Sequence, residues 1–239
     1  MNLGVRDAAK LLTVSERTIY RWIGQGTLPA YRIGDQFRFN RTELLEWATS
    51  RRLNVSAEAF AEPESAGLEA TVRLSDALRA GGIFYRVEGG DKQSALKSVV
   101  EMLRLPEDVD REYLYQVLLA RESLGSTGIG DGIAIPHVRN PVVLHVTQPT
   151  VALCFLEHPI DFGAIDGQPV HVLFTLISPT VRSHLRMLSL LSFALREPSF
   201  KQVLKEQGPR ETILAEVQRI ESKLAVTANA VSSAGGQTS

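Results

Sequence analysis

The sequence predicts a layered α/β protein with a second, smaller folding unit at its N-terminus. From about residue 73 onward, segments with a helical period alternate with continuous apolar runs of strand length. Such runs are typical of central strands that are covered on both faces. The chain has 239 residues, and a domain has roughly 100–200, so one large domain or two modest ones are expected.

The composition is that of an ordinary globular protein. Apolar residues make up 44% and charged residues 22%, which excludes wholesale disorder, a collagen-like repeat and a charge-dominated tail. No run approaches the roughly 20 apolar residues that cross a bilayer, so we expect no membrane partner. The N-terminal residues MNLGVRDAAKLL lack the apolar core and cleavage site of a signal peptide. The single cysteine, Cys154, fits a reducing compartment, so the cytoplasm is the expected location.

Changes of composition divide the chain into two units. The segment NVSAEAFAEPESAGLEAT, which begins at Asn54, is rich in Ala, Glu, Ser and Pro and predicts a linker. The last residues, AVTANAVSSAGGQTS, have no large side chains to bury and predict a disordered tail. We therefore expect a head over residues 1–53, a linker over 54–72, a body over 73–224 and a tail over 225–239.

The charge is distributed unevenly between these units. Residues 1–55 contain nine Lys and Arg against five Asp and Glu, a net charge of +4, and because the whole chain carries −1, the remainder carries −5. A small basic head on an acidic body indicates that the head alone meets a polyanion.

The head has the layout of a winged helix-turn-helix. The expected elements are a helix over Val5–Leu12, a helix over Glu16–Gln25 capped by Ser15, a hairpin of Ala30–Ile33 and Gln36–Phe39 joined by Gly34-Asp35, and a third helix capped by Asn40 with Glu43 in a capping box. The string VSERTIYRWI, followed by G.LPA.RIG..FRF, closely resembles the excisionase-like and MerR-like DNA-binding domains.

That resemblance implies DNA as a partner and a recognition helix in the major groove. By matching positions, the residues that would face DNA are Arg17, Thr18, Tyr20 and Arg21 on the second helix, and Arg32 and Arg38 on the wing. The alternative is that these are solvated charges on a small helical domain.

The body alternates helices with strands. Helices are expected over Leu74–Leu78, Ser94–Leu105, 111–122, Ser183–Leu195 and Pro209–Leu224, and strands over Ile83–Val87, Val151–Leu156 and Val170–Ile177.

The segment Arg121–Pro141 is the most informative part of the body. Gly125, Gly128, Gly130 and Gly132 lie within eight residues, together with Ser126 and Thr127. Glycines let backbone N–H groups approach an anion. A nucleotide P-loop is excluded because no lysine follows the last glycine and the segment follows a helix. A short strand over Ile133–Pro136 then ends at His137, which is where a phosphate acceptor is expected.

The strings ARESLGSTGIGDGIAIPH, FGAIDGQPVHVLFTLISP and SHLRMLSLLSFAL closely resemble the type-2 enzyme IIA domain of the bacterial phosphotransferase system, and among its members the nitrogen-regulatory, PtsN-like branch. The resemblance implies a three-layer α/β/α domain with a mixed sheet. It also implies that His137 accepts a phosphoryl group from the phosphocarrier protein HPr or its homologue, with His184 as the second active-site histidine and Arg121 as the motif arginine. Many members have glycine after the histidine, whereas here Val138-Arg139 follow.

The chemistry of these residues suits phosphoryl transfer. A histidine is mostly neutral near pH 7, so a ring nitrogen can attack phosphorus without a separate base. The transition state needs positive charge and N–H donors around its oxygens. We expect Arg121, the hydroxyls of Ser126 and Thr127, and the backbone amides of Gly128–Gly132 to provide them, with His184 bonding a phosphoryl oxygen. No ATP, metal or other cofactor is required, and Cys154 is expected in the core.

The sequence thus predicts a regulator that couples a phosphohistidine to DNA or to protein targets. Whether such a phosphohistidine carrier counts as an enzyme, a phosphotransferase, is left open. Because one small DNA-binding module buries only about 600–1,000 Å² of protein surface, we expect a homodimer or tandem sites. One alternative is that the body is an interaction module that is never phosphorylated. Another is that the head docks proteins rather than DNA.

Overall fold

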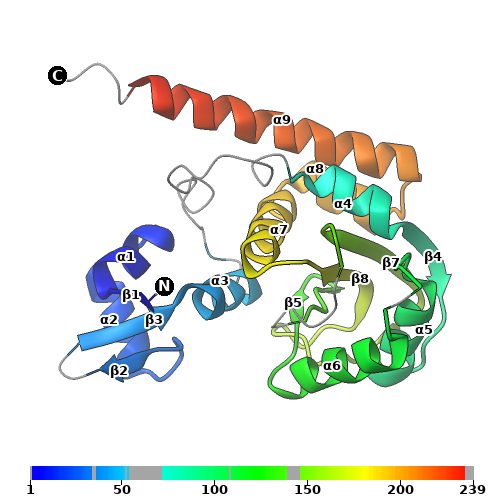
Figure 1. The fold of residues 1–239 in the computed structure, drawn as a ribbon, viewed down its shortest axis with the longest axis horizontal. Coiled ribbons are helices and arrows are strands. Elements are labelled where there is room, and N and C mark those ends of the chain that lie inside the picture. Colours follow the sequence, from blue (N-terminus) through cyan, green and yellow to red (C-terminus); the bar gives the residue numbers. More distant parts are fainter. Residues whose placement is uncertain are drawn as a thin grey trace.

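The computed structural model describes residues 2–33, 36–51, 53, 72–107, 109–138 and 146–234. The expected linker, apart from residue 72, lies outside the described residues, as do Gly34-Asp35, Arg139 and positions 235–239. The described parts form a small head and a larger body (Figure 1).

The head consists of three helices and a three-stranded sheet. Its elements are β1 (Asn2–Leu3), α1 (Val5–Leu11), α2 (Glu16–Gly24), β2 (Tyr31–Ile33), β3 (Gln36–Asn40) and α3 (Arg41–Ser50). Ser15 caps α2, because its Oγ accepts a hydrogen bond from the backbone N–H of Thr18 at 3.2 Å. Strand β1 is an addition to the predicted elements. It is only two residues long and is held by pairing with β3, so local sequence carries no signal for it.

The body contains a mixed sheet, as the resemblance implied, and this sheet has five strands. Its strands are β4 (Ile83–Val87), β5 (Gly128–Gly130), β6 (Ile133–Ala134), β7 (Thr150–Ile160) and β8 (Val170–Ile177), in the order β4-β7-β8-β6-β5. The pairs β4–β7 and β6–β8 are parallel, whereas β7–β8 and β5–β6 are antiparallel.

Helices cover both faces of this sheet, which makes three layers (Figure 1). On one face lie α4 (Leu74–Gly81), α7 (Val181–Ala194), α8 (Pro198–Lys205) and α9 (Arg210–Ala234), and on the other lie α5 (Lys92–Met102) and α6 (Arg111–Ser123). Successive residues of β7 alternate between the two apolar clusters: Leu153 packs in the first and Cys154 in the second. Burial raises the pKa of the Cys154 thiol to about 12.

Two helical segments of the body differ most from the prediction. Helix α8 was not expected, and α9 continues to Ala234 although a tail was predicted from residue 225. The extension is rich in alanine, the strongest helix former, and lengthening an existing helix is far easier than starting one.

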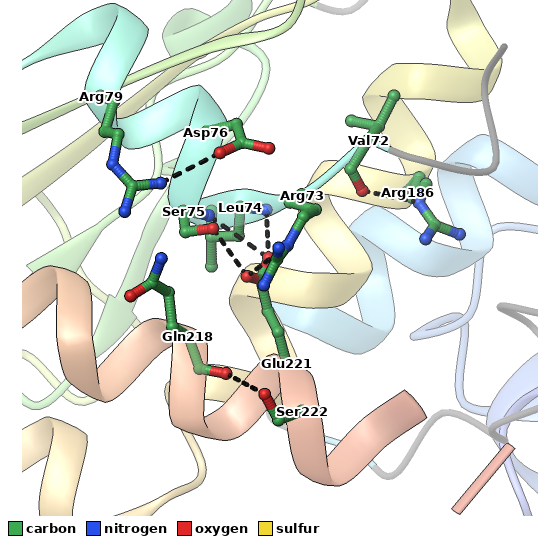
Figure 2. Close-up of polar contacts among 10 residues, drawn as sticks. All are labelled: Val72, Arg73, Leu74, Ser75, Asp76, Arg79, Arg186, Gln218, Glu221 and Ser222. Atoms are coloured by element: carbon green, nitrogen blue, oxygen red, sulfur yellow. Dashed lines mark hydrogen bonds and ion pairs between the residues drawn. The ribbon is translucent and has the colours of Figure 1, made fainter. Parts of the chain in front are cut away.

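A carboxylate on α9 fixes the start of the body (Figure 2). Glu221 accepts hydrogen bonds from the backbone N–H of Leu74 at 2.5 Å and from the Ser75 hydroxyl at 2.8 Å. It also forms an ion pair with Arg73 at 3.4 Å. An anion at a helix N-terminus is stabilising, so this contact ties α9 to the first turn of α4. In the described part of the chain, no helix is both long and apolar enough to cross a membrane.

Candidate functional site

His137 is held at the sheet by its backbone and by one ring nitrogen. It lies beside β8, where it forms a parallel bridge with Leu176, and only 4% of its surface is exposed. Its Nδ1 lies 2.7 Å from the carbonyl oxygen of Ile135. Because a carbonyl can only accept a hydrogen bond, Nδ1 carries the proton and Nε2 keeps its lone pair.

Arg121 lies directly beside that lone pair. Its Nε donates a hydrogen bond to Nε2 of His137 at 3.3 Å, and its Nη1 donates to the carbonyl oxygen of Gly125 at 3.0 Å. The arginine belongs to the last turn of α6. The guanidinium is therefore fixed where it can pair with an anion bound at Nε2.

His184 brings a second imidazole to the same place from α7. The ring centroids of His137 and His184 are 5.2 Å apart, with 44° between the ring planes, and His184 is 1% exposed. Thr180 caps the helix in a capping box with Ser183, which fixes the turn that carries His184. The structure thus brings together the three residues expected to perform the chemistry: His137, His184 and Arg121.

The glycine-rich segment forms an edge strand rather than an open loop. Residues Gly128–Gly130 are β5, which makes a hairpin with β6. A Cβ at Gly128 would lie 2.7 Å from the Cα of Ala164, so glycine is needed for close packing there. At Gly132 φ is +72°, and a Cβ would lie 2.2 Å from the ring of His171.

The polar groups of this segment are bonded within the protein. The Ser126 hydroxyl donates to the carbonyl oxygen of Phe162 at 2.6 Å and accepts from the N–H of Gly128 at 3.0 Å. The Thr127 hydroxyl donates to Glu122 at 2.6 Å. Sequence reasoning expected these two hydroxyls, with Gly128 and Gly130, to hold phosphate. In the structure the hydroxyls and the Gly128 amide hold the segment in place beside the histidines.

Glu122 was missed by sequence reasoning. Its buried carboxylate accepts from the N–H and the hydroxyl of Thr127, and it forms an ion pair with Lys92 at 3.1 Å. It follows Arg121 in the chain, so it anchors the segment just where the guanidinium reaches His137. Negative charge is unfavourable in the last turn of a helix. The position of this glutamate was therefore the only sequence signal that it has a specific partner.

Val138 departs from the usual motif without entering the site. Its side chain is buried in the apolar cluster beneath α5 and α6. No group of three or more His, Cys, Asp or Glu side chains suited to a metal ion occurs among the residues described.

The head presents the predicted DNA-facing residues on adjacent elements. Arg17, Tyr20 and Arg21 are exposed on α2, and Arg32 is exposed on β2, whereas Thr18 and Arg38 are half-buried. Thr18 bonds the Ser15 hydroxyl at 2.9 Å, and Arg38 donates to Gln36 at 2.5 Å. The rings of Tyr20 and Phe37 meet edge to face with their centroids 6.3 Å apart, which joins α2 to the wing.

Comparisons with known proteins match both units. Residues 77–220 match the family described as phosphoenolpyruvate-dependent sugar phosphotransferase system, EIIA 2, and residues 3–52 match the family described as helix-turn-helix domain. A nitrogen regulatory protein of Pseudomonas aeruginosa is 35% identical over 146 residues, which cover 59% of this chain and 92% of that protein. One from Escherichia coli is 34% identical over 139 residues, covering 57% and 84%. The crystal structure of the nitrogen regulatory protein IIA-Ntr from Neisseria meningitidis has a TM-score of 0.51 and 29% identity, and the match covers 63% of this chain and 98% of that one.

Proposed function

The chain belongs to the EIIA 2 family of the phosphoenolpyruvate-dependent sugar phosphotransferase system, and we propose that its body accepts a phosphoryl group on Nε2 of His137. The donor is the phosphohistidine of an HPr-type carrier protein. The observation that carries the proposal is the pair of contacts on one ring: Nδ1 bonded to a backbone carbonyl and Nε2 facing Arg121.

The transfer exchanges one P–N bond for another. The bond between phosphorus and the donor's histidine breaks as the bond to Nε2 forms, and the Nδ1 proton of His137 stays in place. The guanidinium of Arg121 then moves its hydrogen bond from Nε2 to a phosphoryl oxygen, and His184 provides a second partner for the phosphoryl group. The low exposure of both rings excludes water and protects the phosphohistidine from hydrolysis.

Exposed apolar side chains offer a docking surface for the donor. Leu124 is 69% exposed, Ile165 58% and Val181 41%. Leu124 follows Arg121 by three residues, Val181 precedes His184 by three, and the N–H of Ile165 bonds the carbonyl of Gly128. Apolar residues next to a reactive group are typical of a protein-binding site.

The head supports a role in DNA binding. It is basic, it matches a helix-turn-helix family, and it exposes Arg17, Tyr20 and Arg21 on its second helix. We propose that phosphorylation of His137, which adds up to two negative charges, changes how the chain binds DNA or a regulatory protein target.

One observation favours a second candidate. Both site histidines are almost fully buried, as they would be in an interaction module that is never phosphorylated. The two candidates differ in one outcome, the appearance of a phosphohistidine.

The test is phosphoryl transfer to the purified chain. Wild type is mixed with phosphoenolpyruvate, enzyme I and an HPr-type carrier, and intact mass is measured. The wild-type chain and His158→Ala, in which an exposed histidine on β7 is replaced, should each gain one phosphoryl group, whereas His137→Ala should gain none. Absence of the added mass from all three proteins would support the interaction module.

A further inference from the structure

The head contacts the body directly beside the candidate site. Helix α3 packs against α7 and against β5 (Figure 1). Leu185 of α7 packs against the apolar core of the head. It is the residue after His184, so the first turns of α7 lie between the head on one side and the two imidazoles on the other.

A cleft of about 550 Å³ lies between the two units. Trp22, Trp47, Arg51 and Leu53 line it from the head, and Ile129, Gly130, Asp131, Ile165 and Asp166 line it from the body. The cationic Arg51 thus shares the cleft with two carboxylates. The residues that line the cleft from the body belong to β5, to the turn that follows β5 and to the loop whose Ile165 N–H bonds the carbonyl of Gly128.

The surface of the body that a donor protein needs overlaps the contact between the head and the body. A protein–protein interface of standard size covers about 800 Å² on each partner, which corresponds to a patch roughly 16 Å in radius. The patch must surround His137, because phosphoryl transfer requires the donor atom within roughly 3–3.5 Å of Nε2. The ring of His184 is 5.2 Å from that of His137, and the next residue, Leu185, already contacts the head. Part of the patch is therefore already covered.

We propose that docking of the head and docking of the phosphocarrier protein exclude one another on this face of the body. Ile165 is the residue the two surfaces share: it is one of the exposed apolar residues beside the site and it also lines the cleft against the head. Phosphoryl transfer to His137 then proceeds from molecules whose head has moved away. This inference rests on the proposed function.

The chain carries its own reporter of head docking. Trp22 and Trp47 are its only two tryptophans, and both line the cleft. Their rings meet at 5.0 Å, and the guanidinium of Arg51 lies 5.1 Å from the ring centroid of Trp47. Displacement of the head therefore exposes both indoles to a soluble quencher.

The experiment compares variants on both sides of the contact in the full chain. Arg51→Glu places a carboxylate opposite Asp131 and Asp166, and Leu185→Glu places a charge in the apolar contact from the body side. Lys97→Glu, on the exposed surface of α5, is the matched control. Quenching of tryptophan emission by acrylamide is measured for each, followed by the rate of phosphorylation by a phosphorylated HPr-type carrier.

Both contact variants should show increased quenching and faster phosphorylation than wild type. The phosphorylation rate should rise about tenfold if roughly one tenth of wild-type molecules are undocked. Lys97→Glu should change neither quenching nor rate. Increased quenching with an unchanged phosphorylation rate would overturn the inference and leave the proposed function intact. Unchanged quenching in both contact variants would also overturn it, because the head would not be docked in solution. Failure of every protein, wild type included, to take up phosphate would overturn the proposed function, and the inference with it.

Discussion

A backbone carbonyl selects the nitrogen of His137 that is proposed to attack phosphorus. The carbonyl of Ile135 accepts from Nδ1, and this leaves Nε2 toward Arg121. A neutral imidazole with a fixed tautomer needs no general base. In the proposed reaction the side chains around it therefore act on the charge of the phosphoryl group and not on a proton.

Arg121 should contribute mainly to the rate of transfer. Its guanidinium is the cation nearest to Nε2 among the described contacts, and loss of one preorganised donor costs roughly 10²–10³ in rate. We expect Arg121→Ala to slow phosphorylation by about that factor and Arg121→Lys to recover part of it, in single-turnover assays with a phosphorylated carrier. Arg79→Ala, on α4, serves as control. An Arg121→Ala chain phosphorylated at the wild-type rate would contradict this role.

His171 should make stability depend on pH. Burial lowers its pKa below the usual 6.5, so the unfolded chain takes up a proton that the native chain excludes. Stability is therefore complete above pH 6.5 and falls as the pH drops below it. The free energy of unfolding, measured with urea between pH 7 and pH 5, should fall less steeply with decreasing pH in His171→Gln than in wild type. His158→Gln should follow the wild-type pH dependence. An equal pH dependence of the unfolding free energy in all three proteins would show that His171 is not its source.

At the scale of elements, the hairpin of β5 and β6 presents His137, and α6 holds the hairpin. Glu122 connects them, since it accepts two hydrogen bonds from Thr127 and pairs with Lys92 of α5. Helix α6 therefore supplies both Arg121, which faces Nε2 of His137, and the carboxylate that positions the glycine-rich segment.

Replacement of that carboxylate should destabilise the body. Glu122→Gln keeps the shape but loses the charge-assisted bonds to buried groups, at a cost of about 1–3 kcal/mol. Urea denaturation measures the free energy of unfolding, and Glu101→Gln, at an exposed position on α5, should leave it unchanged. Equal unfolding free energies for Glu122→Gln and wild type would show that the network is not needed to hold the segment.

Helix α2 should carry the electrostatic part of DNA binding. Each phosphate contact contributes about 0.9 to the slope of log affinity against log salt. If Arg17 and Arg21 each neutralise one phosphate, the double variant Arg17→Ala/Arg21→Ala should lower the slope for duplex DNA by about 2. A double variant at Arg79 and Arg86 of the body is the control. An unaltered slope in the head variant would favour a protein-docking head.

Sequence reasoning located most elements and all three residues that meet at the site. Helical periods and apolar runs are local signals, so β8 and α7 were found close to their observed ends, whereas β7 was predicted to end at Leu156 and continues to Ile160. The pairing of Gly128–Gly130 with β6 and the bond from Thr127 to Glu122 depend on contacts formed only in the folded chain. For that reason the segment was predicted as a loop rather than a strand, and Glu122 was not identified.

At the scale of the whole molecule, the chain joins a helix-turn-helix unit to a domain of the EIIA 2 family. The arrangement in Figure 1 puts α3 of the head against α7, the helix that carries His184. Phosphorylation at the proposed site and a change in the position of the head would therefore involve the same turn of helix. If His137 is phosphorylated as proposed, this turn is the physical route from phosphorylation to DNA or partner binding.

The central claim is that Nε2 of His137 is the atom that receives phosphorus. NMR of the phosphorylated chain with ¹⁵N-labelled histidine identifies the phosphorylated residue and nitrogen through phosphorus–nitrogen and proton–nitrogen couplings. The account predicts one phosphohistidine, at Nε2, which is absent from His137→Ala. Phosphorus on Nδ1 of His137, or on His184 instead, would contradict it.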